Sequence, residues 1–243
     1  MGVYLYPNNV QKELKNWYIW EYVEPRTPWV NTVAYYPLTS SSTVNDQSWN
    51  NKNMTQSWTV TYGTNWWVDC AYFNGGYLYL NESLVLWSNP RTINCWFNRT
   101  SPLSDAWAFR WMGNPSSWAW ITLYSHGGAY VGHYGYGNRS IDLLYDDGII
   151  PVNNWTLISF TYDGTDAKVY QNWVYLWVPH YWTTYTTAIS LSLTSWKTTI
   201  CAMPNLSGTW FKGYMSNFIF ENVARTVEEI QNYYNQTKSN YWL

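Results

Sequence analysis

From Asn31 onward the chain is a series of short apolar alternations separated by turn residues. Clear examples are 32-TVAYYPL-38, 155-WTLISFTYDG-164 and 214-YMSNFIFEN-222. Short strands at regular spacing, broken by Gly, Asn, Asp and Ser, are typical of β-sandwiches. Strands do not alternate with helical segments, which argues against a parallel α/β sheet. The sequence therefore predicts an all-β fold, a two-sheet antiparallel β-sandwich over about residues 33–222.

One segment departs from this pattern, 224-ARTVEEIQNYYNQTKSN-240. Thr226 is a good helix N-cap, and Glu229, three residues later, completes a capping box. The positions that recur on one face at helical spacing are Val227, Ile230 and Tyr234. The segment predicts one short C-terminal helix near residues 226–236.

Residues 1–32 hold two short alternations, VYLY and WYIW, followed by the proline-bearing EPRTPW. We expect an N-terminal arm or connector over residues 1–32 and a sandwich domain with its helix over residues 33–243. The first residues contain no apolar signal-peptide core, and no run of about 18 apolar residues predicts a membrane span. These patterns predict either a piece of a larger protein or export by a route without such a signal.

The composition points to a polar but uncharged surface. Aromatic residues make up 21% of the chain and charged residues 12%, so Asn, Ser, Thr, Gln and Tyr must form much of the exterior. Such a surface suits neutral ligands such as glycans, although Tyr, Trp and Thr are also ordinary strand formers. A net charge of −2 without a basic run argues against nucleic-acid binding.

The three cysteines, Cys70, Cys95 and Cys201, contain no C-x-x-C pair, which argues against a structural zinc site. One disulfide plus a free thiol is one interpretation. Three reduced cysteines buried on strands is the interpretation we favour.

Seven pieces of the chain, covering roughly residues 33–235, occur in an order that resembles a known family. They are 34-AYYPLTSSSTVNDQSWNN-51, 72-YFNGGYLYL-80, 92-TINCWFN-98, 153-NNWTLISFTYDG-164, 167-AKVYQNWVYL-176, 199-TIC-201 and 212-KGYMSNFIFENVARTVEEIQNYY-234. Together they resemble the laminin-G-like (LamG-like), concanavalin A-like lectin/glucanase jelly-roll domains of bacterial surface and phage structural proteins. The family implies two facing antiparallel sheets of about 12 to 14 strands in all.

The resemblance implies a non-catalytic binding or adhesion module that recognises carbohydrate on an extracellular, cell or virion surface. The expected partner is a glycan or a surface protein, with neighbouring domains of a larger surface or tail protein also in contact. A structural module of a phage tail or fibre is the alternative function, and a glycoside hydrolase is a second alternative.

Tryptophan stands at several turns where the family has glycine. The family's Asp-x-Ser-Gly-Asn reads Asp46-Gln-Ser-Trp49-Asn here, and its Asn-Gly hairpin tip reads Asn172–Trp173. Trp177 also falls at a frequent glycine position. Other tryptophans in turn-like settings are Trp20, Trp29, Trp58, Trp66, Trp87, Trp182 and Trp196.

Three interpretations of these tryptophans stay open: natural aromatic richness, a glycan-binding surface, and glycine codons translated as tryptophan. UGA is a stop codon in the standard code, encodes tryptophan in some variant codes, and is read as glycine in some bacterial lineages. If glycine is native, Trp49, Trp173 and Trp177 should have positive φ and exposed rings. Trp96 and Trp155, which match family tryptophans, should instead be buried with ordinary strand dihedral angles.

No nucleophile elbow and no phosphate loop occur in the sequence. Glycoside hydrolysis needs two suitably spaced carboxyl groups, and the densest acidic stretch, 142-DLLYDD-147, offers Asp142 and Asp146. We interpret this stretch as a solvated strand end and expect a protein that is not an enzyme.

The Gly- and Tyr-rich segment 124-YSHGGAYVGHYGYGN-138 is the candidate ligand-binding segment. Aromatic rings stack on sugar rings while hydroxyl and imidazole groups form hydrogen bonds. The candidate ligand-binding residues are Tyr124, His126, Tyr130, His133 and Tyr136. The alternative is a strand–turn–strand with alternating exposed tyrosines.

Calcium is the cofactor that the family suggests, because oxygen-rich loops bind it through carboxylates, amides and carbonyls. The best candidate loop contains Asp46, Asn50 and Asn51. Asp46 matches a frequent family position at which the carboxylate often caps a turn instead.

Overall fold

The computed structural model describes the backbone of residues 9–14, 17–22, 30–57, 59–84, 89–100, 109–114, 119–125, 129–134, 151–176, 197–201 and 211–243. Side chains are described in these ranges except in 9–14, 17–22, 109–114, 119–125 and 129–134. The chain divides into two compact units, Met1–Val30 and Asn31–Leu243. The domain boundary predicted between residues 32 and 33 stays a prediction.

The first unit contains an antiparallel hairpin of β1 (Asn9–Leu14) and β2 (Trp17–Tyr22). The WYIW alternation lies in β2, whereas VYLY lies outside the described residues. Trp20, which the sequence placed in a turn-like setting, is inside β2. That expectation was wrong, because the strand continues past Trp20 to pair Asn9 with Tyr22.

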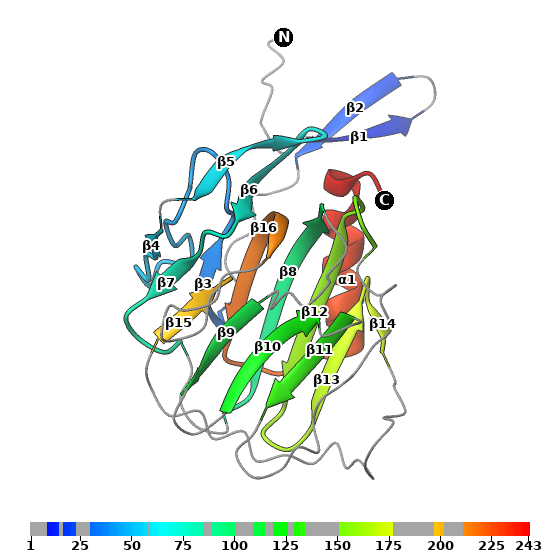
Figure 1. The fold of residues 1–243 in the computed structure, drawn as a ribbon. Coiled ribbons are helices and arrows are strands. Elements are labelled where there is room, and N and C mark those ends of the chain that lie inside the picture. Colours follow the sequence, from blue (N-terminus) through cyan, green and yellow to red (C-terminus); the bar gives the residue numbers. More distant parts are fainter. Residues whose placement is uncertain are drawn as a thin grey trace. The chain divides into compact units, whose positions relative to one another are not determined.

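The second unit is mostly β, with two antiparallel sheets and a single short C-terminal helix, so the predicted fold class is confirmed (Figure 1). The smaller sheet has the order β11-β10-β9-β15-β7-β4. Its strands are β4 (Thr55–Gln56), β7 (Leu78–Leu80), β9 (Phe109–Asn114), β10 (Ala119–Ser125), β11 (Ala129–Tyr134) and β15 (Lys197–Ile200).

The larger sheet has the order β14-β13-β12-β8-β16-β6-β5, with β3 also paired to β16. Its strands are β3 (Thr32–Tyr36), β5 (Val60–Asn65), β6 (Val68–Asn74), β8 (Arg91–Arg99), β12 (Thr156–Tyr162), β13 (Ala167–Gln171), β14 (Val174–Tyr175) and β16 (Lys212–Glu221).

The hydrophobic core lies between these two sheets. Leu78 and Ile200 of the smaller sheet join Phe160 and Phe218 of the larger sheet in one buried cluster. Phe73, Leu78 and Leu80, all from 72-YFNGGYLYL-80, are 0%, 0% and 8% exposed. Burial of this apolar area supplies the main driving force for folding.

Strand β16 changes partner partway along one edge. Its first residues pair with β6 and its last with β3, while β8 pairs along the other edge. The register shifts between Ser216 and Ile219, and Asn217 in between has a φ of 53°. This bulge bends the strand, and the Asn217 side-chain amide donates a hydrogen bond to the Tyr241 hydroxyl at 2.6 Å.

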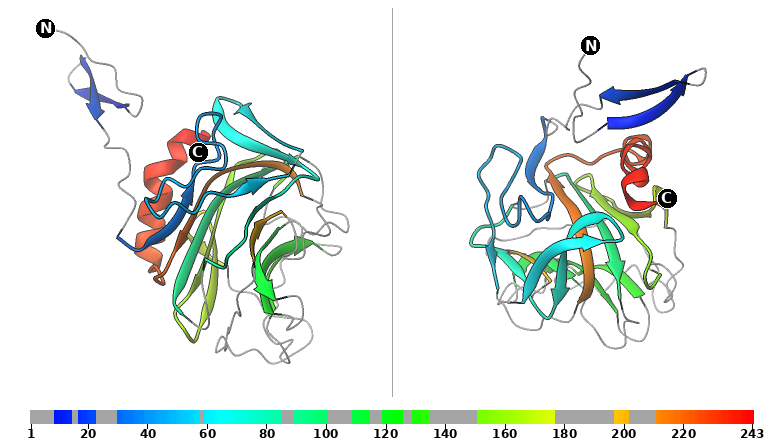
Figure 2. Two further views of the ribbon diagram at one scale, coloured as in Figure 1. Left: turned by 90° about the vertical axis from the view of Figure 1, so that its left-hand side faces the viewer. Right: turned by 90° about the horizontal axis from the view of Figure 1, so that it is seen from above.

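Two helical elements follow β16, α1 (Val227–Thr237) and the 3₁₀ helix η1 (Lys238–Tyr241). They lie on the side of the larger sheet that faces away from the smaller sheet (Figure 2). Trp96 of β8 is 0% exposed and stacks on Tyr241, with ring centroids 3.9 Å apart. Its neighbours Cys95 and Phe97 belong to the core cluster instead. Because side chains alternate along β8, one face of the strand packs in the core between the sheets and the other face packs against the helical elements.

The predicted capping box of α1 is confirmed, with Thr226 as N-cap and Glu229 as its reciprocal partner. Two of the three residues on the predicted helix face contact the sheet, because Ile230 is buried and Tyr234 is half-buried and stacks on Trp96 with ring centroids 5.8 Å apart, whereas the prediction for Val227 was wrong. The buried residues are Ile230, Tyr233 and Thr237, whereas Val227 is 37% exposed. Val227 is the first residue of α1 and lines the surface pocket beside β12 and β13, so it is left exposed although its spacing matches the buried face.

All three cysteines are free and buried, as favoured from the sequence. Cys70 is in β6 and Cys95 in β8, whereas Cys201 follows the last residue of β15 rather than lying on it. Among the described residues, no helix is both long and apolar enough to cross a membrane.

Trp49 and Trp173 have positive φ, 73° and 70°, as predicted for glycine positions. Trp49 is 86% exposed, but Trp173 is only half-buried rather than largely exposed, because it lies beside β13 in the hairpin. Trp96 and Trp155 are 0% and 4% exposed and have no positive φ, as predicted. The other tryptophans predicted at turns and lying outside the described residues are Trp29, Trp58, Trp87, Trp177, Trp182 and Trp196.

Candidate functional site

The predicted ligand segment forms an antiparallel hairpin of β10 and β11 in the smaller sheet. Tyr124 is the register partner of Tyr130, and His133 is the partner of Ile121. Directly opposed residues in an antiparallel pair have Cβ atoms about 4.5–5.5 Å apart. The topology thus brings Tyr124 and Tyr130 together, while His126 and Tyr136 lie outside the described residues.

The predicted calcium loop is organised around the carboxylate of Asp46. Its Oδ1 accepts the N–H groups of Tyr35 at 2.9 Å and Ser48 at 2.8 Å. Its Oδ2 accepts the Ser48 hydroxyl at 2.8 Å and the N–H of Lys52 at 2.9 Å. Four donors therefore surround one half-buried carboxylate.

The two asparagines of this loop also bond within the chain. The Asn50 side-chain amide donates to the carbonyls of Thr32 at 2.9 Å and Val33 at 3.1 Å, and Asn51 Oδ1 accepts the Asn53 amide at 3.0 Å. Calcium needs six to eight oxygen ligands, so an ion at Asp46 would have to displace N–H donors. The arrangement fits a turn-capping carboxylate, and the calcium site at Asp46, Asn50 and Asn51 stays a prediction.

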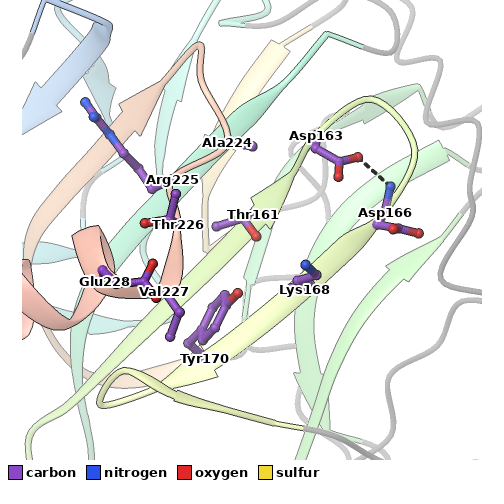
Figure 3. Close-up of a pocket in the computed structure, with 10 residues that line it drawn as sticks. All are labelled: Thr161, Asp163, Asp166, Lys168, Tyr170, Ala224, Arg225, Thr226, Val227 and Glu228. Carbon is purple, nitrogen blue, oxygen red and sulfur yellow. Dashed lines mark hydrogen bonds between the residues drawn. The ribbon is translucent and has the colours of Figure 1, made fainter.

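A second candidate site, not predicted from the sequence, is a pocket of about 340 Å³ between β12, β13 and the start of α1. Figure 3 shows its lining residues, which are Thr161, Asp163, Asp166, Lys168, Tyr170, Ala224, Arg225, Thr226, Val227 and Glu228. Two local patterns of the sequence fall in this pocket, the Asp-Gly turn at Asp163–Gly164 and the helix cap at Thr226. No pattern in the sequence predicts that these two segments lie side by side.

The charged groups of this pocket are held by their own neighbours. The Arg225 guanidinium is directed away from the other lining residues (Figure 3) and bonds to Glu221 at 2.8 Å and Glu229 at 2.7 Å. Asp163 accepts the N–H groups of Asp166 and Thr165, each at 2.7 Å. The pocket therefore offers Lys168 as its exposed cation.

Two of the pocket's carboxyl groups, Asp163 and Glu228, have pKa values below their ordinary values. The N–H of Asp166 holds the pKa of Asp163 below its ordinary value. The backbone N–H at Glu228 and the Thr226 hydroxyl lower the pKa of Glu228 in the same way. Glycosidases need a carboxylic acid whose pKa is raised, and these two groups are shifted in the opposite direction.

The acidic pair considered from the sequence, Asp142 and Asp146, lies outside the described residues. Within the part of the chain that the structure describes, no three His, Cys, Asp or Glu side chains gather as a metal site.

No protein-family model matches the chain, and no curated protein matches it in sequence. Solved structures do match. Domain 4 of AbnA, a GH43 extracellular arabinanase from Geobacillus stearothermophilus solved with arabinotriose, aligns with a TM-score of 0.63 and 18% identity. That alignment covers 83% of this chain and 97% of the arabinanase domain.

Two toxin structures match over a similar share of this chain. The binding domain of Paraclostridial Mosquitocidal Protein 1 has a TM-score of 0.61 and 15% identity, over 84% of this chain and 52% of its own. A botulinum neurotoxin type C structure, described as depending on two ganglioside molecules for cell entry, has a TM-score of 0.59 and 14% identity, over 84% and 51%. The chain thus spans about half the length of these toxin structures. These similarities show a shared β-sandwich fold.

Proposed function

We propose that this chain is a non-catalytic carbohydrate-binding module of the LamG-like, concanavalin A-like type that works on an extracellular or cell surface. The observation that carries the proposal is the alignment with almost the whole of an arabinanase domain solved with arabinotriose. A toxin of the same fold is described with gangliosides, which are glycolipids. One neighbour was solved with an arabino-oligosaccharide and the other is described as depending on gangliosides, so both descriptions name sugar-bearing molecules.

The chemistry of the described residues supports binding without hydrolysis. The surface has few charges, which suits a neutral ligand. The pocket carboxyl groups Asp163 and Glu228 have lowered pKa values and stay ionised, so neither is a suitable general acid.

The ligand site of this proposal is the β10–β11 hairpin. Its central feature is the opposed pair Tyr124 and Tyr130, and we assign His126 and Tyr136 to the same site. His133 is three residues after Tyr130 in β11, so strand alternation places it on the other face of the hairpin. Directly opposed residues of an antiparallel pair are near neighbours, and tyrosine combines an apolar ring that stacks on sugars with a hydroxyl that forms hydrogen bonds. The expected partners are a glycan or glycosylated surface protein and neighbouring domains of the same surface protein.

A glycan array that includes arabino-oligosaccharides and ganglioside oligosaccharides tests the proposal with the full 243-residue chain. We expect binding that a double Tyr124→Ala, Tyr130→Ala variant loses. The matched control is Tyr72→Ala, Tyr214→Ala, because these residues form an opposed tyrosine pair on the larger sheet, with ring centroids 4.8 Å apart. The control variant should keep full binding.

A folded protein that binds no glycan contradicts the proposal and favours the alternative, a structural module of a phage tail or fibre. Release of reducing sugar from a bound polysaccharide would contradict the non-catalytic part alone.

A further inference from the structure

Five of the seven tryptophans whose side chains the structure describes have a left-handed backbone. Their φ angles are 73° at Trp49, 49° at Trp66, 74° at Trp67, 70° at Trp173 and 63° at Trp242. Positive φ is uncommon outside glycine and asparagine, and for a bulky residue it is a genuine outlier. The other two tryptophans, Trp96 and Trp155, are buried and have no positive φ.

The hairpin between β13 and β14 has a two-residue tip that requires glycine. Gln171 pairs with Val174, and the two residues between them, Asn172 and Trp173, have φ of 48° and 70°. Positive φ at both tip positions is the type I′ turn, for which Asn-Gly is a preferred dipeptide. Asn172 is the expected first residue, and tryptophan occupies the glycine position.

The hairpin between β5 and β6 repeats this geometry. Asn65 pairs with Val68, and Trp66 and Trp67 form the tip with φ of 49° and 74°. Gly-Gly is another of the few dipeptides preferred in this turn. Tryptophan here occupies both positions.

The end of η1 is a third glycine-requiring motif. Trp242 is the cap residue with φ 63° and ψ 35°, and its N–H and that of Leu243 both point back to the Lys238 carbonyl. Helices commonly end in one left-handed residue, which is usually glycine.

The rings compensate little for these conformations: Trp173 is half-buried, and the Trp242 ring N–H donates an exposed hydrogen bond to the Trp66 carbonyl at 3.1 Å. Trp49, Trp66, Trp67 and Trp242 are 86%, 65%, 85% and 71% exposed, so they gain little burial. A sugar-stacking tryptophan needs an exposed ring but has no need of a left-handed backbone. Among the described positive-φ residues, four are asparagines, which tolerate this region, and nothing in the structure explains Leu38, Thr43 and Cys201.

We propose that Trp49, Trp66, Trp67, Trp173 and Trp242 are glycine in the protein made by its own cells, because their codons are UGA read as glycine. Trp96 and Trp155 are true tryptophans with UGG codons. The inference is independent of the proposed function. It removes exposed tryptophans at these turns from the set of ligand residues, since the native chain does not carry them.

The codons of the gene give the first test. UGA at all five positions together with UGG at Trp96 and Trp155 is the expected result. UGG at the five turn positions would overturn the proposal.

Protein stability gives the second test, which asks whether the five turns require glycine. Three 243-residue proteins are compared by thermal unfolding. They are the sequence given, a variant with glycine at all five positions, and a variant with alanine at the same five positions. The alanine variant removes the rings but keeps the Cβ that clashes at positive φ.

We expect the glycine variant to have a Tm about 10 °C or more above that of the alanine variant, from five positions at about 2–4 °C each. A glycine variant no more stable than the alanine variant would show that these turns have no glycine requirement, and would overturn the proposal. Peptide masses of the protein purified from its own cells should show glycine at the five positions, and tryptophan there would overturn it equally.

Discussion

Asp46 shows how a single side chain can join a loop to a strand. Its two oxygens accept hydrogen bonds from Tyr35 in β3 and from Ser48 and Lys52 in the following loop. Residues on either side of the turn are thus held by one carboxylate. Trp173 is the opposite case, because its backbone has a φ of 70°, a conformation that its own Cβ destabilises.

We expect Asp46→Asn to lower the free energy of unfolding by about 1–3 kcal/mol, because the new NH₂ group faces N–H and O–H donors and leaves them unpaired. Urea unfolding measures the change, once in calcium and once in EDTA. The loss should be the same in both buffers. The control is Asp166→Asn, which makes the same change of charge at a turn. Calcium-dependent stability of the unmodified chain that disappears in the Asp46 variant would support the calcium prediction instead.

Trp173→Gly should raise the free energy of unfolding by about 1 kcal/mol or more, since glycine reaches positive φ without a Cβ clash. Trp173→Ala should give no such gain. Val174→Gly serves as the matched control, because it places glycine next door at a residue without positive φ and should destabilise the hairpin. Chemical denaturation of the three variants distinguishes a backbone effect from the loss of the ring.

The helix α1 follows β16, a strand of the larger sheet, and precedes the 3₁₀ helix η1 near the end of the described chain. Its N-terminus is held by a reciprocal pair of hydrogen bonds, Glu229 N–H to the Thr226 hydroxyl at 3.3 Å and Thr226 N–H to the Glu229 carboxylate at 2.8 Å. Arg225 adds ion pairs to the buried Glu221 and to Glu229. The helix therefore begins at a defined residue before it packs through Ile230 and Tyr233.

Thr226→Ala should cost about 1 kcal/mol of stability, because one N–H at the helix start loses its acceptor. Thr226→Ser keeps the hydroxyl and should stay close to the original stability. Guanidinium unfolding followed by circular dichroism is the measurement. An alanine variant as stable as the serine variant would mean that tertiary packing, and not the cap, positions α1.

Across the whole second unit, burial on both sides of the larger sheet controls reactivity as well as stability. Cys70, Cys95 and Cys201 are 1%, 0% and 1% exposed. Burial raises the pKa of the Cys70 thiol to about 12 and places the pKa values of Cys95 and Cys201 well above the ordinary value. The reactive thiolate form is therefore scarce at neutral pH.

We expect a thiol reagent at pH 8 to label none of these cysteines in the folded protein and all three in denaturant. Adding a reductant should leave the Tm unchanged, because no disulfide joins them. Rapid labelling of the native protein would show that the sandwich opens locally around the labelled strand.

Local patterns in the chain were enough to identify its elements. Alternation with turn residues predicted the strands, the Thr226 and Glu229 spacing predicted the start of α1, and Trp96 and Trp155 were predicted to be buried. These features depend on residues that are close to one another in the sequence, so short stretches of sequence are enough to predict them. The mismatch at Trp173 was visible for the same reason, since a two-residue hairpin tip is a local motif.

Contacts between distant parts of the chain required the fold. The partner exchange of β16 at Asn217, and the choice of Tyr233 for the buried helix face, depend on strands and rings that pack only after long-range pairing. The candidate sites also depend partly on local sequence and partly on tertiary structure. The sequence located the Tyr124–Tyr136 segment, but the register that sets Tyr124 opposite Tyr130 comes from strand pairing. The role of Asp46 as a capping group likewise depends on donors from β3, which packing alone brings within reach.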